Sequence, residues 1–478
     1  MSAPARPRPG AGPSPLVPLA YLVCAASAFL VASLGVAWLG PELAGHYYHP
    51  RLLALTHTVT LGWITVAIMG ASYQLIPIVL ERPIWSERLA RWQLAIVAIA
   101  VTGMVAHFHL GTWPGLAAAA ALLAVGIALH LGNVGMSLRG FTQWTFTARL
   151  VVLAYGGLAL TTLFGLALAI NRVWPFLPGE FFPALHAHVQ LALLGWVAPM
   201  ILAVGARVYP MFFLAPAPRR AHTLLQLWGL AAGLPAVVLG LLGVPGLLVA
   251  GALAVAVAAG AHAAWMCEMA WGRKRPGLDW GLRFVLTATA FLAPAAVLGV
   301  AMAADRLAGP RVALAYAVVT LGGWVSLTIA GMMLKIVPFL VWYRTYSPRA
   351  GREPVPTLAQ ISWPRAEGLA YPLLTGGVVL LAATVLVGEA TWIRVAGAVL
   401  ALGALALAAA LARVLGHLRA SSAGARRWPP HSLGGGQPFT SLGSSAAGAQ
   451  KWPPHSPSPR SPREEPPRSA SRIAPRSA

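Results

Sequence analysis

The sequence predicts an all-α polytopic membrane protein with about twelve transmembrane helices in three pseudo-symmetric four-helix blocks. The first observation is composition: 58% of the residues are hydrophobic and 10% are charged, whereas soluble domains carry roughly 25% charged residues. The second is that apolar runs of about 20 residues, long enough to cross a bilayer as helices, recur along most of the chain. The third is an internal repeat.

In that repeat, a Gly-Trp pair is followed by a proline 14 residues after the tryptophan. The three copies are Gly62-Trp63 with Pro77, Gly195-Trp196 with Pro210, and Gly323-Trp324 with Pro338. The tryptophans are 133 and 128 residues apart. A repeat at this period indicates one ancestral block of about four membrane helices that is used three times.

The elements follow in chain order. A Pro-, Ala- and Arg-rich segment, 1–15, is expected to be disordered, and 16–418 form the membrane domain. Its helices are expected near 16–40, 52–80, 90–110, 115–137, 148–170, 183–213, 222–242, 245–268, 281–303, 311–342, 370–388 and 392–416. The Ser-, Pro- and Arg-rich composition of 419–478 predicts a disordered cytoplasmic tail.

The basic residues predict the orientation in the membrane. Loops after even-numbered helices, with the adjoining helix ends, hold 15 of them: Arg82, Arg88, Arg91, Arg139, Arg149, Arg219, Arg220, Arg273, Lys274, Arg275, Arg283, Arg344, Arg349, Arg352 and Arg365. Loops after odd-numbered helices hold 5: Arg51, Arg172, Arg306, Arg311 and Arg394. The positive-inside rule therefore predicts that both termini are cytoplasmic, and we expect a multi-pass protein of a bacterial inner membrane. The net charge of +22 reflects this bias and the basic tail, so we expect the lipid bilayer and no nucleic acid as a partner.

Five histidines fall near the predicted extracytoplasmic ends of their helices: His57, His107, His109, His186 and His188. A polar group in hydrocarbon costs a few kcal/mol unless it is paired or bound, so intramembrane histidines are functional candidates. The alternative for each is a hydrogen bond to a neighbouring helix or to interfacial water. His186 and His188 are separated by about 200° around a helix, so they could serve two neighbouring cofactors. Neutral imidazole is a usual axial ligand of haem iron.

The third copy of the repeat has no histidine. Counting back from Trp324, the positions equivalent to His57 and His188 hold Val318 and Tyr316, so the chemistry is expected in the first two blocks. Acidic residues number 12 in the whole chain, and no chain of intramembrane acids suggests a proton relay. Transport remains an alternative, because polar residues recur 11 positions after each repeat tryptophan, at Gln74, Arg207 and Lys335.

These motifs resemble subunit I of the haem-copper oxidases, especially the C-family cytochrome c oxidases and the large subunit of nitric oxide reductases. The matching segments are RLLALTHTVTLGW with GASYQLIP, the link ERPIWSERL, and HAHVQLALLGW. The resemblance implies twelve helices in three arcs, with haem near the extracytoplasmic side. It also implies a role in respiratory electron transport, with a small c-type cytochrome or another electron-donor subunit as partner.

The internal repeat allows two alignments with that family. In the first, His57 resembles a ligand of a low-spin haem, His188 is its partner across the iron, and His186 could hold a second haem. In the second, His57, His107 and His109 resemble copper ligands, His186 the axial ligand of a reactive haem, and His188 faces a low-spin haem. We favour the first, because it needs no ligand from the third repeat.

The expected function is therefore redox chemistry or electron transfer at one or two b-type haems. Copper stays open as a second cofactor, and oxygen or nitric oxide is the expected ligand. Whether the chain is a haem-dependent oxidoreductase that turns over a substrate stays open. A haem sensor without turnover, such as the membrane proteins of the nitric oxide response, is one alternative. A transporter that uses the membrane histidines is the other.

Overall fold

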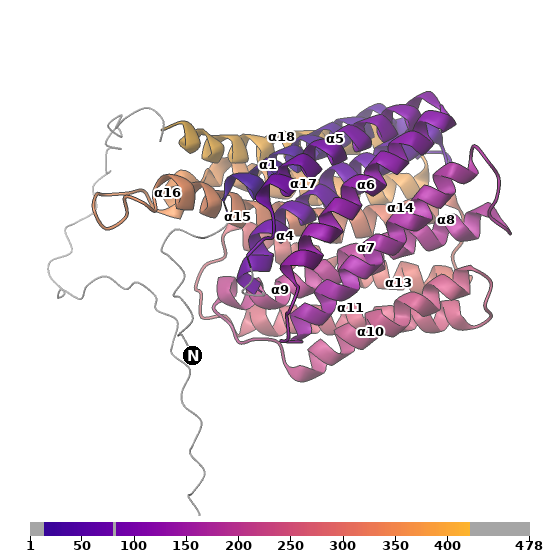
Figure 1. Cartoon of the computed structure of the whole chain (residues 1–478). Coiled ribbons are helices and arrows are strands. Elements are labelled where there is room, and N and C mark those ends of the chain that lie inside the picture. Colours follow the sequence, from indigo (N-terminus) through magenta and orange to yellow (C-terminus); the bar gives the residue numbers. More distant parts are fainter. Residues whose placement is uncertain (1–13, 80–82, 421–478) are drawn as a thin grey trace, which may run out of the picture. The chain divides into compact units, whose positions relative to one another are not determined.

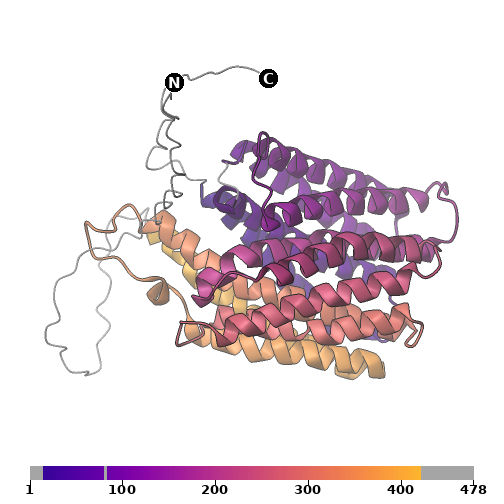
Figure 2. The same cartoon turned by 90° about the horizontal axis from the view of Figure 1, so that it is seen from below.

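The computed structural model describes residues 14–79 and 83–420, and within them every named element is a helix. Twelve helical stretches in this part are long and apolar enough to cross a membrane. They run side by side in both views (Figure 1, Figure 2). The predicted fold class is confirmed.

The elements in chain order are α1 (Leu16–Trp38), α2 (Gly40–Leu43), α3 (Pro50–His57), η1 (Thr58–Thr65), α4 (Val66–Val79), α5 (Glu87–Leu110), α6 (Trp113–Ser137), α7 (Phe146–Asn171), α8 (Phe181–Gln190), η2 (Leu191–Val197), α9 (Ala198–Phe213), α10 (Arg220–Leu241), α11 (Leu247–Trp271), α12 (Trp280–Ala290), α13 (Leu292–Ala303), α14 (Pro310–Ala317), η3 (Val318–Ser326), α15 (Leu327–Thr345), α16 (Leu358–Ile361), α17 (Pro364–Val387) and α18 (Ala390–Ala420). Helix α18 includes the first two residues of the predicted tail. The rest of that tail, and most of the predicted N-terminal disordered segment, lie outside the described residues.

The three repeat copies form the most buried spans of the bundle. They are Pro50–Pro77, Phe181–Phe213 and Pro310–Thr345, with 67%, 72% and 83% of their most apolar windows buried, against 22–56% for the other spans. Each of them changes from α-helix to π-helix around its Gly-Trp pair, as η1, η2 and η3. Single π-helical turns within α-helices often mark functional sites.

The repeat tryptophans tie these central spans together. Trp63 Nε1 donates to Ser326 Oγ at 3.0 Å, and Trp196 Nε1 donates to Thr65 Oγ1 at 3.3 Å. Both acceptors lie two residues after a repeat tryptophan, and the second copy has Ala198 at that position. The first copy is therefore hydrogen-bonded to the third, and the second to the first, through buried side chains.

The outer helices surround this centre, and the first and last spans are neighbours. Helix α1 packs on α18 (Figure 1), where Gly397 allows the close approach, because a Cβ there would lie 2.3 Å from the backbone nitrogen of Ala37. Large apolar side chains such as Leu163 and Val297 are exposed on the flank of the bundle. A lipid-facing surface explains that exposure.

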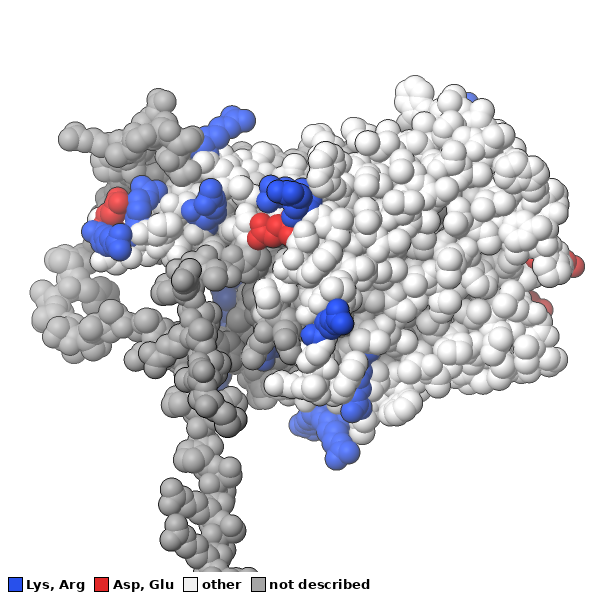
Figure 3. Space-filling view, viewed as in Figure 1, with Lys and Arg blue, Asp and Glu red and all other residues white. Residues whose placement is uncertain are grey.

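Charged side chains gather at the ends of the bundle. Lys and Arg are concentrated where α9 and α15 end, and the adjoining flank is uncharged (Figure 3). We call this end the arginine end, defined by Arg219, Arg275, Arg344 and Arg349. The opposite end, where α3 and α8 begin and α5 ends, is called the histidine end, defined by His57, His107, His109, His186 and His188.

Candidate functional site

His57 and His188 are held in the same way, although they lie on different repeat helices. Nδ1 of His57 lies 2.7 Å from the carbonyl oxygen of Leu53, and Nδ1 of His188 lies 3.1 Å from that of Thr161. A carbonyl oxygen only accepts, so each Nδ1 carries the proton and each Nε2 presents a lone pair. Neither Nε2 has a hydrogen-bond partner among the described residues. Metal-binding imidazoles commonly have this arrangement, with the other ring nitrogen bonded to a carbonyl.

The two imidazoles are close enough to interact electrostatically. Each remains partly accessible, although it belongs to a mostly buried span. His57 is the last residue of α3 and directly precedes η1, while His188 lies three residues before η2. Phe108 of α5 stacks on the His57 ring at 4.6 Å between centroids. The site therefore has two imidazoles with preset tautomers and an aromatic side chain packed against one of them.

Gly165 makes space for the His188 ring. A Cβ at this position of α7 would lie 2.8 Å from Cε1 of His188, which is closer than non-bonded carbon atoms approach. The same helix supplies the Thr161 carbonyl that binds Nδ1. Helix α7 thus fixes both the position of the His188 ring and its tautomer.

His186 lies in a different environment from His188. Its Nε2 is 3.0 Å from the hydroxyl of Tyr47, and its ring lies beside that of Phe182. The two histidines of the His-x-His motif therefore contact different neighbours, as their angular separation predicts. In the described structure, Nε2 of His186 is engaged with Tyr47 rather than unpaired.

The structure does not bring His107 and His109 together with His57. Nδ1 of His107 lies 2.7 Å from Thr112 Oγ1, and the ring packs on Gly115 of α6. His109 is exposed. Among residues 14–79 and 83–420, no group of three or more His, Cys, Asp or Glu side chains could hold a metal ion. The three copper ligands of the second alignment are therefore not assembled in this arrangement.

Sequence reasoning missed a buried polar network in the first block. His130 Nδ1 lies 3.0 Å from the hydroxyl of Tyr73, which donates to Gln93 Oε1 at 2.5 Å. Asn133 Nδ2 donates to the Ser86 carbonyl at 2.9 Å. These interactions connect α4, α5 and α6 towards the arginine end. Polar amide and imidazole residues within three successive apolar runs were the signal that could have indicated this network.

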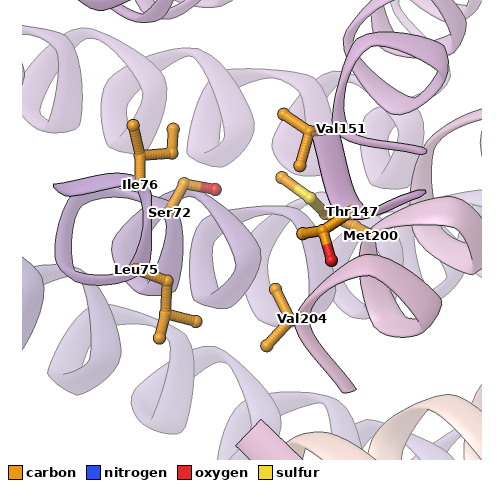
Figure 4. Close-up of a pocket in the computed structure, with 7 residues that line it drawn as sticks. All are labelled: Ser72, Leu75, Ile76, Thr147, Val151, Met200 and Val204. Atoms are coloured by element: carbon orange, nitrogen blue, oxygen red, sulfur yellow. The ribbon is translucent and has the colours of Figure 1, made fainter. Parts of the chain in front are cut away.

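A small cavity lies near this network. Its volume is about 20 Å³, and it lies between α4, α7 and α9, with Ser72 and Thr147 contributing the hydroxyls (Figure 4). That volume suits roughly one water molecule. It is far too small for a haem, and none of the five histidines of the histidine end lines it.

The polar positions that suggested transport have separate environments. Lys335 Nζ lies 2.6 Å from Asp279 Oδ2, and Arg275 lies 3.1 Å from the same oxygen. Gln74 Oε1 is buried without a hydrogen-bond partner in the described residues. Asp279 also caps α12 by accepting from Leu282. Lys335 therefore takes part in a structural ion pair at the arginine end.

Comparison with known proteins gives a partial match. No protein-family model matches the chain. Over 141 residues the chain is 26% identical to quinol oxidase subunit 1 of Sulfolobus acidocaldarius, and the aligned stretch covers 27% of each protein. That protein is a haem-copper oxidase subunit I. The similarity is consistent with a divergent relative of that subunit.

Proposed function

We propose that this chain is a haem-binding integral membrane protein, divergent from haem-copper oxidase subunit I, with a role in electron transfer. The observation that carries the proposal is the pair of imidazoles, His57 and His188, each with Nδ1 bound to a backbone carbonyl and Nε2 unpaired. These two imidazoles would hold a b-type haem, which would supply one-electron redox chemistry when bound.

The chain's own groups would prepare these two ligands. The carbonyls of Leu53 and Thr161 fix the tautomers, so no proton has to leave before Nε2 binds iron. Gly165 leaves room for His188, and Phe108 supplies a flat apolar surface against His57. The surrounding apolar helices would exclude water from the site, which is one way in which proteins set the potential of an iron centre.

The match also bears on the reaction partners. The relative's name makes a quinol one class of electron donor, beside a c-type cytochrome or another donor subunit. We propose oxygen or nitric oxide as the ligand. A second haem at His186 would first require His186 Nε2 to leave the hydroxyl of Tyr47, and copper at His107 and His109 is a further proposed cofactor. A haem protein without turnover is the second candidate. It is favoured because His57, His107 and His109 do not form a group that could hold a metal ion in the described part of the chain.

The test is the absorption spectrum of purified protein from haem-replete cells. We expect the reduced protein to show the spectrum of a six-coordinate b-type haem. His57→Ala and His188→Ala should each remove or convert that low-spin signal. His222→Ala is the matched control, because His222 pairs with Glu268 at the arginine end. A colourless wild-type preparation would reject the proposal and favour transport.

A further inference from the structure

Five buried polar atoms without a hydrogen-bond partner in the described residues lie on one helix pair, α10 and α11. They are Oε1 and Nε2 of Gln226, Nδ1 of His222, Nδ1 of His262 and Nε1 of Trp265. Gln226, His262 and Trp265 are only 1%, 2% and 2% exposed. Because an unpaired polar atom inside an apolar bundle is costly, a cluster of them indicates a bound ligand.

These side chains form a short polar row on each helix. His222 and Gln226 are four residues apart on α10, and His262 and Trp265 are three residues apart on α11. Residues at these spacings lie on the same face of a helix. The rings of His262 and Trp265 are 5.7 Å apart and meet edge to face. Each helix therefore contributes two neighbouring polar groups rather than an isolated one.

The close packing of the two helices sets their register and brings the two rows together. The helices are consecutive and antiparallel, and a Cβ at Gly229 would lie 2.8 Å from Cβ of Ala258. From this contact, moving back along α10 corresponds to moving forward along α11. Gln226 therefore lies at the level of His262, to within one residue. Both side chains are buried at this level.

The polar rows reach the surface at the arginine end. His222 Nε2 lies 3.7 Å from Glu268 Oε1, and the other carboxylate oxygen of Glu268 lies 3.4 Å from Arg219 Nε. The Glu268 side chain is 38% exposed. Helix α11 ends at Trp271, nine residues after His262, which corresponds to about 14 Å along a helix. The rows thus lead from the exposed carboxylate into the membrane span.

The mixture of donors and acceptors identifies the class of ligand. Nε1 of Trp265 only donates, Oε1 of Gln226 only accepts, and Nε2 of Gln226 only donates. An anion would satisfy the donors alone, and a metal cation would satisfy the acceptors alone. Residues 14–79 and 83–420 also contain no group of three His, Cys, Asp or Glu side chains that could hold a metal ion. Water both donates and accepts, so it is the small ligand that fits all of these atoms.

We propose that α10 and α11 hold a cluster of bound water molecules that is continuous with the aqueous phase at the arginine end. The waters bridge the indole N–H of Trp265, the amide of Gln226 and the imidazole of His262. They reach the surface past His222 and Glu268. The helix pair is thus a hydrated inlet, through which water and its exchangeable protons enter the membrane span. This inference does not depend on the proposed haem.

The experiment is radiolytic footprinting of the full-length protein in lipid nanodiscs, in which hydroxyl radicals formed from bound water oxidise the nearest side chains. Trp265 should be oxidised at least about tenfold faster than Trp63 and Trp196, because a bound water lies within hydrogen-bond distance of its ring. Trp63 and Trp196 are matched controls, since they are 0% and 2% exposed and their Nε1 atoms donate to protein hydroxyls. Gln226→Leu removes two of the groups that hold the waters, so Trp265 oxidation should fall to the level of the controls.

Brief mixing with H₂¹⁸O in oxygen-depleted buffer before irradiation tests the connection to the arginine end. We expect ¹⁸O in the oxidised Trp265, and ¹⁶O alone would show enclosed waters and overturn the inlet. Wild-type Trp265 that is oxidised as slowly as Trp63 would overturn the whole inference, and this result needs no variant to fold. Unchanged Trp265 oxidation in a Gln226→Leu protein with the wild-type thermal midpoint would also contradict it. Haem content decides none of these outcomes.

Discussion

Gly165 shows how one missing side chain can determine the position of a histidine ring. A methyl group at this position would lie 2.8 Å from Cε1 of His188, so Gly165→Ala must displace the ring or helix α7. Because α7 also supplies the carbonyl that fixes Nδ1 of His188, we expect loss of most low-spin haem with little change in expression. The reduced spectrum and the pyridine haemochrome content measure this. Wild-type haem levels in Gly165→Ala would argue against His188 as a ligand.

Gly115 provides the matched substitution for the other histidine cluster. Its Cβ would lie 2.1 Å from the ring of His107, so Gly115→Ala displaces His107 in the same way. If His57 and His188 hold the haem, this variant should keep the haem content and spin state of wild type, because His107 bonds to Thr112 and to neither proposed ligand. Loss of bound copper, measured by elemental analysis, would instead support the alignment that makes His107 a copper ligand.

Glu42 is a titrating group of α2 that lies outside the membrane spans. Burial acts to raise its pKa, but its own backbone amide and the hydrogen bond and charge of Arg51 together hold the pKa below the ordinary value of 4.5. A lowered pKa means that the ionised Glu42 stabilises the fold above that value, and that this stability is lost as the pH falls through the folded-state pKa. We expect the thermal midpoint to fall less on acidification in Arg51→Gln than in wild type. Equal slopes in the two proteins would contradict a stabilising ion pair.

At the scale of the elements, the π-helix η1 directly follows His57 and takes part in a hydrogen bond between two copies of the repeat. Thr65, in η1, accepts from Trp196 Nε1, and both side chains are buried. Thr65→Val keeps the shape but leaves the indole N–H unpaired, which should cost about 1–3 kcal/mol. Thr60→Val is the control in the same π-helix, because its hydroxyl bonds only to the carbonyl of Thr56. The thermal midpoints of the two variants are compared in the same detergent. Equal decreases would contradict a stabilising hydrogen bond between Trp196 and Thr65 beyond the effect of losing any hydroxyl in this helix.

The sequence predicted these elements better than it predicted their internal geometry. The Gly-Trp and proline repeat marked three helices, and the structure shows that these are the most buried spans of the bundle. The change from α- to π-helix is decided by a few backbone hydrogen bonds, which leave no mark in hydropathy. The ion pair between Lys335 and Asp279 likewise joins residues 56 apart in sequence, which the repeat pattern does not indicate.

At the scale of the whole molecule, the sequence predicts towards which end of the bundle a side chain lies. It does not predict which neighbouring helix that side chain faces. The five histidines share one end of the bundle because apolar runs fix depth. His57 and His188 each have Nδ1 bonded to a backbone carbonyl and Nε2 without a partner in the described residues. By contrast, Nδ1 of His107 bonds to Thr112 in the turn after α5, and Nε2 of His186 bonds to the hydroxyl of Tyr47. Which partners a side chain meets depends on neighbouring helices, and a single sequence does not specify their rotation.

Orientation is the remaining property of the whole molecule that the charge bias predicts. Glu180 lies in the loop before α8 at the histidine end, and Gly277 lies between α11 and α12 at the arginine end. Both positions are exposed, and a side chain at Gly277 would enter open space. The native thiols are removed first as Cys24→Ala and Cys267→Ala, because Cys267 is exposed. In intact cells, an impermeant maleimide should label Glu180→Cys at once and Gly277→Cys only after permeabilisation. The reverse order would place the histidine end, and with it the proposed haem site, on the cytoplasmic side.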